Sequence, residues 1–349
     1  MTSHRPTRRG RIRIRLPLRR GESGRLEWVS PVHRKPVVQP VHFTPLGPDD
    51  PEVISAFPHL SPKLQKAAQT SWKALARVLH PPGRRLVGRF VEQATVEHIS
   101  VPIRGLEAGF DGYTIAFLSD IHAGPYLKAD ALRKLFAKVS AEKPDLIVLG
   151  GDLVNYDADE ADEVAAALKQ LHARDGVLSV LGNHDHYTGA VASVVSQIEH
   201  SGARYLVNDS LSISRRGDHL AILGVDDGGA GRFDLARARA RARETRTSVL
   251  LSHTPDALPL ASRIGIDLVV SGHTHGGQLR APKFPPISTH TRGRFVDGFY
   301  RFGPTTVFVG RGVGVVCVPM RAFCPPHVPF LHLHALPRAA AGNRGRAIV

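Results

Sequence analysis

Five short apolar runs in this 349-residue sequence each end in side chains that bind metal ions. These side chains offer carboxylate, imidazole and amide donors, and in chain order they are Asp120 and His122, Asp152, Asn183, His253, and His273 with His275. In an open α/β sheet the ligand lies beyond the carboxyl ends of the strands, so the five ends are expected to converge on one place. Because so many polar donors are costly to gather away from water, cations are expected to occupy that place.

The donor types indicate which ions. Carboxylate, imidazole and amide oxygen without thiolate are typical of Mn, Fe, Zn or Mg sites rather than of a sulfur-bound structural metal. One ion needs only about four ligands, whereas this larger set suits two ions about 4 Å apart if one carboxylate bridges them. The predicted cofactor is therefore two divalent ions per chain, with Mn, Fe and Zn left open. Such a pair handles phosphate esters, because the ions bind phosphoryl oxygens and activate a shared water.

The elements that must position these residues alternate between strand and helix from about residue 95. Short, solidly apolar runs are typical of strands buried on both faces, and they span 113–120, 146–152, 177–183, 248–253 and 268–275. Helices are predicted over 128–142, 159–173, 189–201 and, as an exposed helix, 235–246. Gly217-Asp218 predicts a hairpin between 211–216 and 219–225, and further strands are expected from Phe299 onward.

The blocks resemble a known family. Asp120-x-His122, Gly151-Asp152, Gly182-Asn183-His184-Asp185, the single His253 and Gly272-His273-Thr274-His275 are similar, in order and spacing, to those of the calcineurin-like metallophosphoesterases, over about residues 95–335. The resemblance implies an α/β (α+β) fold, a four-layer sandwich of two mixed β-sheets flanked by helices.

The same resemblance implies roles for single residues. One ion would be held by Asp120, His122, Asp152 and His275 and the second by Asp152, Asn183, His253 and His273, with Asp152 bridging. His184 would contact the phosphate and protonate the leaving group, and Asp185 would orient His184.

Four further segments indicate which subgroup of this family the sequence resembles. Residues 251–256 (LSHTPD), 272–278 (GHTHGGQ), 310–314 (GRGVG) and 319–321 (PMR) resemble a bacterial subgroup that often works at membranes. That subgroup includes phosphoesterases related to UDP-2,3-diacylglucosamine pyrophosphatases, which implies a nucleotide-sugar or phospholipid-type substrate. Arg311 and Arg321 are candidates for contact with substrate phosphate, although surface positions are commoner for arginine.

Several other polar residues are expected to have ordinary roles. Capping or solvated positions are predicted for His186, His290 and His327, with His186 near enough to lean over the site. Asp226, Asp227 and Asp256 are interpreted as supporting groups of the site or as turn residues, and Cys317 and Cys324 as buried small side chains.

Charge is concentrated near the start of the sequence. The net charge is +15, and residues 1–50 hold eleven Lys+Arg and four Asp+Glu, a net of +7. A basic arm suits nucleic acid, an anionic membrane surface or no partner at all, and the sequence leaves these three open. The predicted division is an irregular arm over 1–60, an amphipathic helix from Leu64 to Leu79 ended by Pro81-Pro82-Gly83 and followed by a linker within 61–94, the phosphoesterase domain over 95–337, and a flexible tail over 338–349.

Composition excludes other classes. Two Cys cannot form a disulfide framework, and no export signal or membrane-spanning run is read, so the expected location is cytoplasmic and peripheral to the inner membrane face.

The resulting hypothesis is a binuclear phosphoesterase in which a metal-bridging hydroxide attacks phosphorus of a phosphate ester or pyrophosphate. The alternatives are a nuclease that grips nucleic acid with the basic arm and a non-catalytic binding module of the same fold. No protein partner is predicted. Against the nuclease alternative, the arm has few aromatic residues that could stack on bases. Against the non-catalytic module, none of the expected metal ligands is missing from the sequence.

Overall fold

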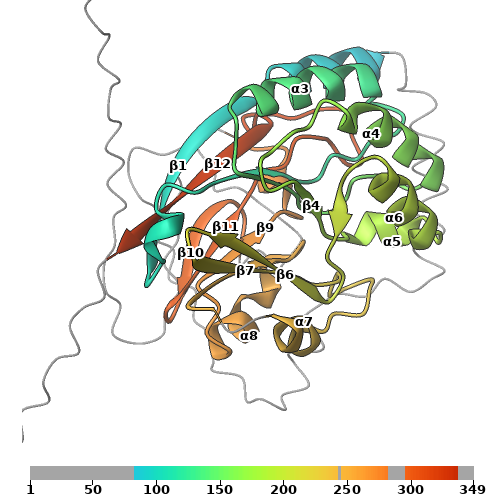
Figure 1. Ribbon diagram of the computed structural model, residues 1–349. Coiled ribbons are helices and arrows are strands. Elements are labelled where there is room, and N and C mark those ends of the chain that lie inside the picture. Colours follow the sequence, from blue (N-terminus) through green and yellow to red (C-terminus); the bar gives the residue numbers. More distant parts are fainter. Residues whose placement is uncertain (1–81, 243–244, 282–294, 337–349) are drawn as a thin grey trace, which may run out of the picture.

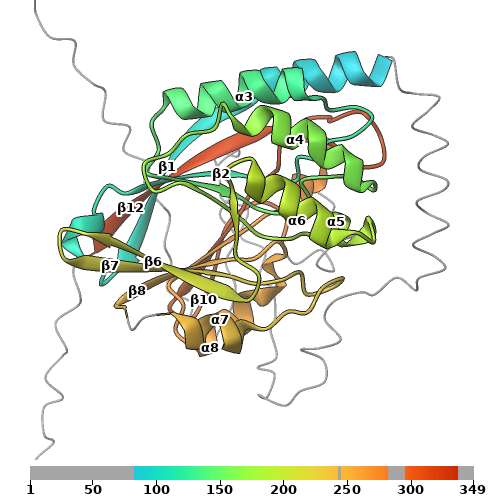
Figure 2. The ribbon, with the colours of Figure 1, turned by 45° about the vertical axis from the view of Figure 1, so that its right-hand side comes forward.

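Two β-sheets lie at the centre of the molecule, with helices on their outer faces (Figure 1, Figure 2). The computed structural model describes residues 82–242, 245–281 and 295–336. The first sheet has the order β1-β12-β2-β3-β4-β5, with the bounds Thr95–Arg104, His327–Leu336, Thr114–Leu118, Leu146–Leu149, Val177–Ser179 and Arg204–Tyr205. Its strands pair in parallel except for β12 with β2.

The second sheet has the order β10-β11-β9-β8-β7-β6, with the bounds Gly298–Phe302, Thr305–Val309, Leu268–Ser271, Thr247–Leu251, Asp218–Gly224 and Asp209–Arg215. Its central strands β11, β9, β8 and β7 pair in parallel, and the outer pairs β10–β11 and β7–β6 are antiparallel. Both sheets are therefore mixed, as expected.

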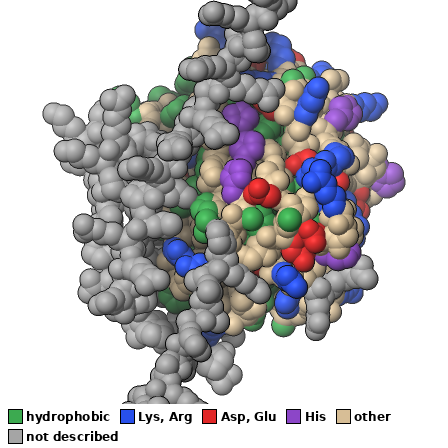
Figure 3. Space-filling model, turned by 60° about the vertical axis from the view of Figure 1, so that its left-hand side comes forward, with side chains coloured by type: hydrophobic (Ala, Val, Ile, Leu, Met, Phe, Trp, Pro, Cys, Tyr) green, Lys and Arg blue, Asp and Glu red, His purple; other side chains and the backbone are tan. Residues whose placement is uncertain are grey.

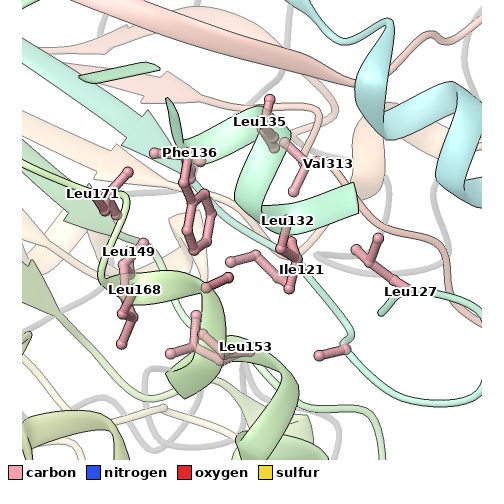
Figure 4. Packing of buried hydrophobic residues seen from close by; sticks show 14 of the residues in the cluster. Ile121, Leu127, Leu132, Leu135, Phe136, Leu149, Leu153, Leu168, Leu171 and Val313 are labelled. Atoms are coloured by element: carbon pink, nitrogen blue, oxygen red, sulfur yellow. The ribbon is translucent and has the colours of Figure 1, made fainter. Parts of the chain in front are cut away.

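Three separate clusters of buried apolar side chains account for the layers. Because side chains alternate along a strand, Ile115 and Phe117 of β2 enter the cluster between the two sheets, whereas Ala116 and Leu118 face the helices. The cluster under the helices includes Leu132 and other residues of α3 (Ala129–Ala141) and Leu168 of α4 (Ala161–Leu168), as Figure 4 shows. A third cluster packs α7 (Leu235–Arg241) and α8 (Leu258–Arg263) on the far side of the second sheet. The four-layer sandwich is thus confirmed.

The helices form where apolar residues repeat at helical spacing. In α3 the buried residues Leu132, Leu135, Phe136 and Val139 lie on one face. The helix predicted over 159–173 is shorter, a 3-10 turn over Ala158–Glu160 followed by α4. The one predicted over 189–201 is preceded by a separate short helix, α5 (Asn183–Tyr187), before α6 (Val191–His200).

Two features differ from the sequence prediction. Residues 82–92 are helical, where Pro81-Pro82-Gly83 was predicted to end a helix and a linker to follow. The linker predicted after this signal is therefore helical over residues 82–92. Strand β1, which pairs along its whole length with β12, was not predicted as a separate strand. The arm, the predicted helix from Leu64 to Leu79 and the tail lie outside the described residues, and no described helix is long and apolar enough to cross a membrane.

Candidate metal centre

The predicted ligands come from the loops that follow five strands. β2, β3 and β4 are parallel neighbours in one sheet, and β8 and β9 are parallel neighbours in the other. Their carboxyl ends therefore meet at one edge of the sandwich, and every predicted ligand follows one of them within a few residues. Most of these ligand side chains are buried. On the surface, Figure 3 shows for one face that histidine and charged side chains of both signs are scattered among apolar and other groups.

The backbone at this edge adopts an unusual conformation. Five of the ligand candidates have positive φ angles: Asp120 at 53°, His122 at 46°, Asp152 at 52°, His273 at 71° and His275 at 51°. Non-glycine residues rarely adopt this left-handed conformation, and where they do the strain is commonly kept for a functional reason. These residues follow β2, β3 and β9, where the left-handed conformation turns the chain sharply after the strand.

Two glycines make the close approach of these loops possible. A Cβ atom on Gly272 would lie 2.5 Å from Oδ2 of Asp120, and one on Gly182 would overlap Oδ1 of Asp152. Each aspartate therefore occupies space that only glycine leaves open in the neighbouring loop.

One group of donors forms around His122. Its Nε2 lies 3.0 Å from Nε2 of His275 and 3.5 Å from Oδ2 of Asp152. Nε2 of His275 lies 3.5 Å from Oδ1 of Asp120. All four side chains are buried.

A second group of donors shares the same aspartate oxygen. Oδ2 of Asp152 lies 3.2 Å from Nε2 of His253 as well as 3.5 Å from Nε2 of His122. Nδ1 of His273 lies 3.2 Å from Nε2 of His253. Oδ1 of Asn183 is buried and has no hydrogen-bond partner within the described structure. One carboxylate oxygen thus faces both groups.

These contacts fit divalent cations. Two pairs of imidazole nitrogens face each other at hydrogen-bond distance, and the buried amide oxygen of Asn183 has no hydrogen-bond partner within the described structure, although buried polar atoms are normally satisfied. A cation between the donors would satisfy the converging lone pairs at once. The number and kind of donors are those that Mn, Fe and Zn accept.

The electrostatics support the same conclusion. Burial, together with the charges of His184, His253 and Arg321, lowers the pKa of His122 well below its usual value, so this imidazole is neutral and ready to donate a lone pair. Burial opposes charge on Asp152, but the nearby histidines, His253 above all, outweigh it and hold the pKa of this carboxyl well below its usual range. Asp152 is therefore anionic within a group of histidines.

Backbone carbonyls fix the orientation of two imidazoles. Nδ1 of His253 donates to O of Gly150 at 2.8 Å, which leaves Nε2 as the nitrogen that faces Asp152. Nδ1 of His184 donates to O of Asn155 at 2.6 Å, which leaves Nε2 as the ring nitrogen that could exchange a proton with a substrate. Since a carbonyl oxygen only accepts, the proton of each ring is placed on Nδ1.

Asp185 was predicted to orient His184, and this prediction is wrong. The buried carboxylate accepts hydrogen bonds from backbone N–H groups, those of Asp152 at 3.0 Å, Leu153 at 3.0 Å, Val154 at 3.3 Å and Gly182 at 2.8 Å. The His184 ring is oriented by the Asn155 carbonyl instead. Asp185 joins the loop after β3 to the loop after β4, a role that residue spacing alone does not reveal.

Arg311 and Arg321 are buried, and the surface position considered commoner is wrong for both. The Arg321 guanidinium donates to O of Gly314 at 2.7 Å, O of Arg311 at 2.9 Å and O of His275 at 3.3 Å. The guanidinium of Arg311 lies 3.7 Å from a carboxylate oxygen of Asp297. Arg321 therefore ties the loop that carries His275 to the 310–314 segment, and contact of either arginine with substrate stays a prediction.

The remaining predictions have mixed outcomes. His186 is half-buried and its Nε2 lies 2.7 Å from Oδ1 of Asp226. His327 is buried against Glu97 rather than solvated. Cys324 is buried as expected, whereas Cys317 is exposed. His290 lies outside the described residues.

Two aromatic residues near His184 were not singled out from the sequence. The rings of Tyr156 and Tyr187 lie 4.8 and 5.1 Å from the His184 ring. Tyr187 follows Asn183 by four residues, one helical turn in α5, so the two side chains lie on the same face of this helix. The i, i+4 spacing of Asn183 and Tyr187 was the signal available in the sequence.

Comparisons with known proteins agree with this site. The family model described as calcineurin-like phosphoesterase matches residues 113–277. The chain is 32% identical over 248 residues to the uncharacterized metallophosphoesterase YkuE of Bacillus subtilis, covering 69% of this chain and 86% of that protein. It is 33% identical over 226 residues to the uncharacterized metallophosphoesterase Cj0846 of Campylobacter jejuni, covering 63% and 58%. It is 31% identical over 260 residues to a Bos taurus protein named transmembrane protein with metallophosphoesterase domain, covering 69% and 57%.

The chain thus belongs to the calcineurin-like metallophosphoesterase family. It is a metal-dependent phosphoesterase. It spans most of the Bacillus relative but little more than half of the other two proteins.

Proposed function

We propose that the protein holds two divalent ions and hydrolyses a phosphate ester or pyrophosphate linkage. The observation that carries this proposal is the position of Asp152, whose Oδ2 lies 3.5 Å from His122 and 3.2 Å from His253. A single oxygen that faces two separate groups of donors is the arrangement expected of a bridging ligand. The groups are completed by Asp120 and His275 on one side and by Asn183 and His273 on the other.

The two ions, when bound, supply Lewis-acid activation of water and of the phosphoryl group. The chain itself supplies the orientation of the donors. Asp185 holds the loop of Asp152 against the loop of Asn183, and the Gly150 carbonyl fixes the tautomer of His253.

His184 is placed to serve as the proton donor. It is buried beside the donor set, with its ring 4.6 Å from that of His122 in an edge-to-face arrangement. Burial lowers the pKa of His184, although Asp152 opposes the shift. Proton donation requires the protonated ring, which the negative charge of Asp152 favours and burial opposes.

A nucleotide-sugar or phospholipid-type substrate is the proposed class. Support comes from the LSHTPD and GHTHGGQ segments and their similarity to diacylglucosamine pyrophosphatase-type enzymes. We further propose that the protein works in the cytoplasm at the inner membrane face, where the +7 charge of residues 1–50 is attracted to anionic lipid.

The test is hydrolysis by protein that has been stripped of metal and then reloaded separately with Mn, Fe and Zn. The substrates are nitrophenyl monoester and diester compounds, a UDP-sugar, a lysophospholipid, and single-stranded DNA and RNA. We expect metal-dependent cleavage that favours the UDP-sugar or the lipid. Cleavage of nucleic acid alone would support the nuclease alternative, and a protein that binds ions without cleaving any substrate would support the binding module.

A further inference from the structure

An exposed apolar loop lies next to the metal centre. In residues 316–325, here called the apolar rim, every side chain that is not buried is apolar: Val316, Cys317, Val318, Pro319, Met320, Ala322, Phe323 and Pro325. Phe323 is 68% exposed and Met320 is 45% exposed. The charged residue of the rim, Arg321, is turned inward. This distribution is the reverse of that in an ordinary surface loop, which buries apolar groups and exposes charges.

The rim is built into the fold. Nε2 of Gln278 donates to the carbonyl oxygens of Val316, Val318 and Met320 at 2.9, 3.3 and 3.2 Å. The neighbouring Leu279, 45% exposed, is paired with the rim at Ala322 and extends the apolar surface. The exposed side chains therefore stand on a backbone that is fixed to the loop of His275.

A basic groove adjoins the rim. It lies between the helix over 82–92 and the start of α3, has a volume of about 470 Å³, and is lined by five basic and two acidic side chains. Arg84, Lys128 and Lys134 are paired with acids, whereas Arg85 and Arg89 form no ion pair within the described part of the chain.

The groove and the rim are in contact through Gly83. A Cβ atom on Gly83 would lie 2.8 Å from the ring of Tyr126, which lines the groove, and 2.9 Å from Pro319 of the rim. The helix that lines the groove therefore packs against the rim at Gly83, which makes the cationic and the apolar surfaces neighbours. The two surfaces together are called the docking face.

We propose that this face docks onto an anionic phospholipid membrane, with the apolar rim inserted among the lipids and the basic groove against their phosphates. Contiguous exposed apolar surface marks an interaction site, and apolar groups flanked by Arg and Lys are typical of segments that lie in the membrane interface. Nucleic acid would match the cations but not Met320 and Phe323. Docking is independent of the chemistry proposed for the metal centre, so each proposal is tested separately.

The experiment measures partitioning of the full chain onto vesicles of phosphatidylcholine with and without 30% phosphatidylglycerol, by co-sedimentation. The apolar variant is Met320→Ser/Phe323→Ser, and its control is Ile264→Ser, which removes a 37% exposed apolar side chain next to α8. The charge variant is Arg85→Glu/Arg89→Glu, and its control with the same net charge is Arg237→Glu/Arg241→Glu on α7. Figures 1 and 2 show α7 and α8 at the opposite end of the molecule from the helix over 82–92.

We expect the charge variant to bind anionic vesicles at least about 30-fold more weakly, since each basic residue near such a surface is worth about fivefold. The apolar variant should lose about tenfold, and the controls should lose less than about twofold. Unchanged melting temperature and unchanged hydrolysis of a soluble ester exclude misfolding. Equal binding by the rim variants and their controls would overturn the proposal. It would also be overturned if the same variants weakened binding to duplex DNA but left vesicle binding unaltered.

Discussion

Asp185 offers a test of how the loops of the metal centre are held together. Its two carboxylate oxygens accept four backbone hydrogen bonds, two on each oxygen: Oδ2 from Asp152 and Gly182, and Oδ1 from Leu153 and Val154. In Asp185→Asn one oxygen becomes an NH₂ group, which cannot accept, so two buried N–H groups lose their partner in either orientation of the amide. Each unsatisfied group costs about 1–3 kcal/mol, which gives a loss of about 2–6 kcal/mol.

The assay is thermal unfolding together with metal content. For a domain of this size about 1 kcal/mol corresponds to about 2–4 °C, so the melting temperature of Asp185→Asn should fall by at least about 4 °C. Bound metal should fall as well, because the loops of Asp152 and Asn183 would no longer be held together. The matched control is Glu160→Gln, which also neutralises a carboxylate bonded to backbone N–H groups.

The control differs in one respect. All three backbone N–H groups of Asn155, Tyr156 and Asp157 donate to the same oxygen of Glu160, Oε2. The amide oxygen of glutamine can take its place, so Glu160→Gln should cost about 1 kcal/mol or less. Equal losses in the two variants, or full metal content in Asp185→Asn, would refute the reasoning that Asp185 joins the loops.

Three further predictions concern catalysis, pH and the arm. His184→Ala should keep both ions and lower kcat by about 10²–10⁴-fold, with a smaller loss for nitrophenol esters than for poor leaving groups; the same loss on both would contradict the acid role. Although burial opposes its charged form, the pKa of His186 is raised by Asp226, with help from Asp227 and Asp185. The His186–Asp226 pair should therefore add about 1 kcal/mol to the free energy of unfolding below pH about 6.5, and this contribution is lost as pH rises through the raised pKa of His186. The free energies of unfolding of wild type and His186→Gln, measured with urea, should converge at high pH. A difference between them that grows with pH would disprove the prediction. Deletion of residues 1–50 should leave soluble-ester hydrolysis intact, because all candidate ligands lie from Asp120 onward, but should weaken salt-sensitive vesicle binding; binding unaffected by deletion or salt would rule out the arm as an anchor.

Much of the site follows from sequence because parallel strands place their ends at one edge. Apolar runs such as 146–152 identified the strands. The polar residues that follow these strands could be assigned to one site from their positions in the sequence alone, without knowledge of tertiary contacts. The order and spacing of the motifs from Asp120 to His275 resembled those of a known family, and this resemblance predicted the fold. The hairpin at Gly217-Asp218 was equally local, since its turn chemistry lies in adjacent residues.

What sequence did not reveal depends on contacts between distant segments. The bond from His184 to the Asn155 carbonyl joins residues 29 apart, and any residue type at 155 would offer the same backbone oxygen. The burial of Arg321 follows from three carbonyl groups in two other segments, the loop of His275 and residues 310–314, and carbonyl groups carry no side-chain signature. The positive φ angles at Asp120 and Asp152 are likewise set by the neighbouring loops and not by a local glycine.

The central claim is that Asp152 bridges two ions. The most direct measurement is the metal content per chain, by elemental analysis, of the wild type and Asp152→Asn after reloading with Mn and dialysis, with the magnetic coupling of the Mn ions followed by electron paramagnetic resonance. We predict about two coupled ions per chain in the wild type, and in Asp152→Asn a lower content, no coupling and no turnover. Two ions with normal turnover in Asp152→Asn, or a single uncoupled ion in the wild type, would contradict the account.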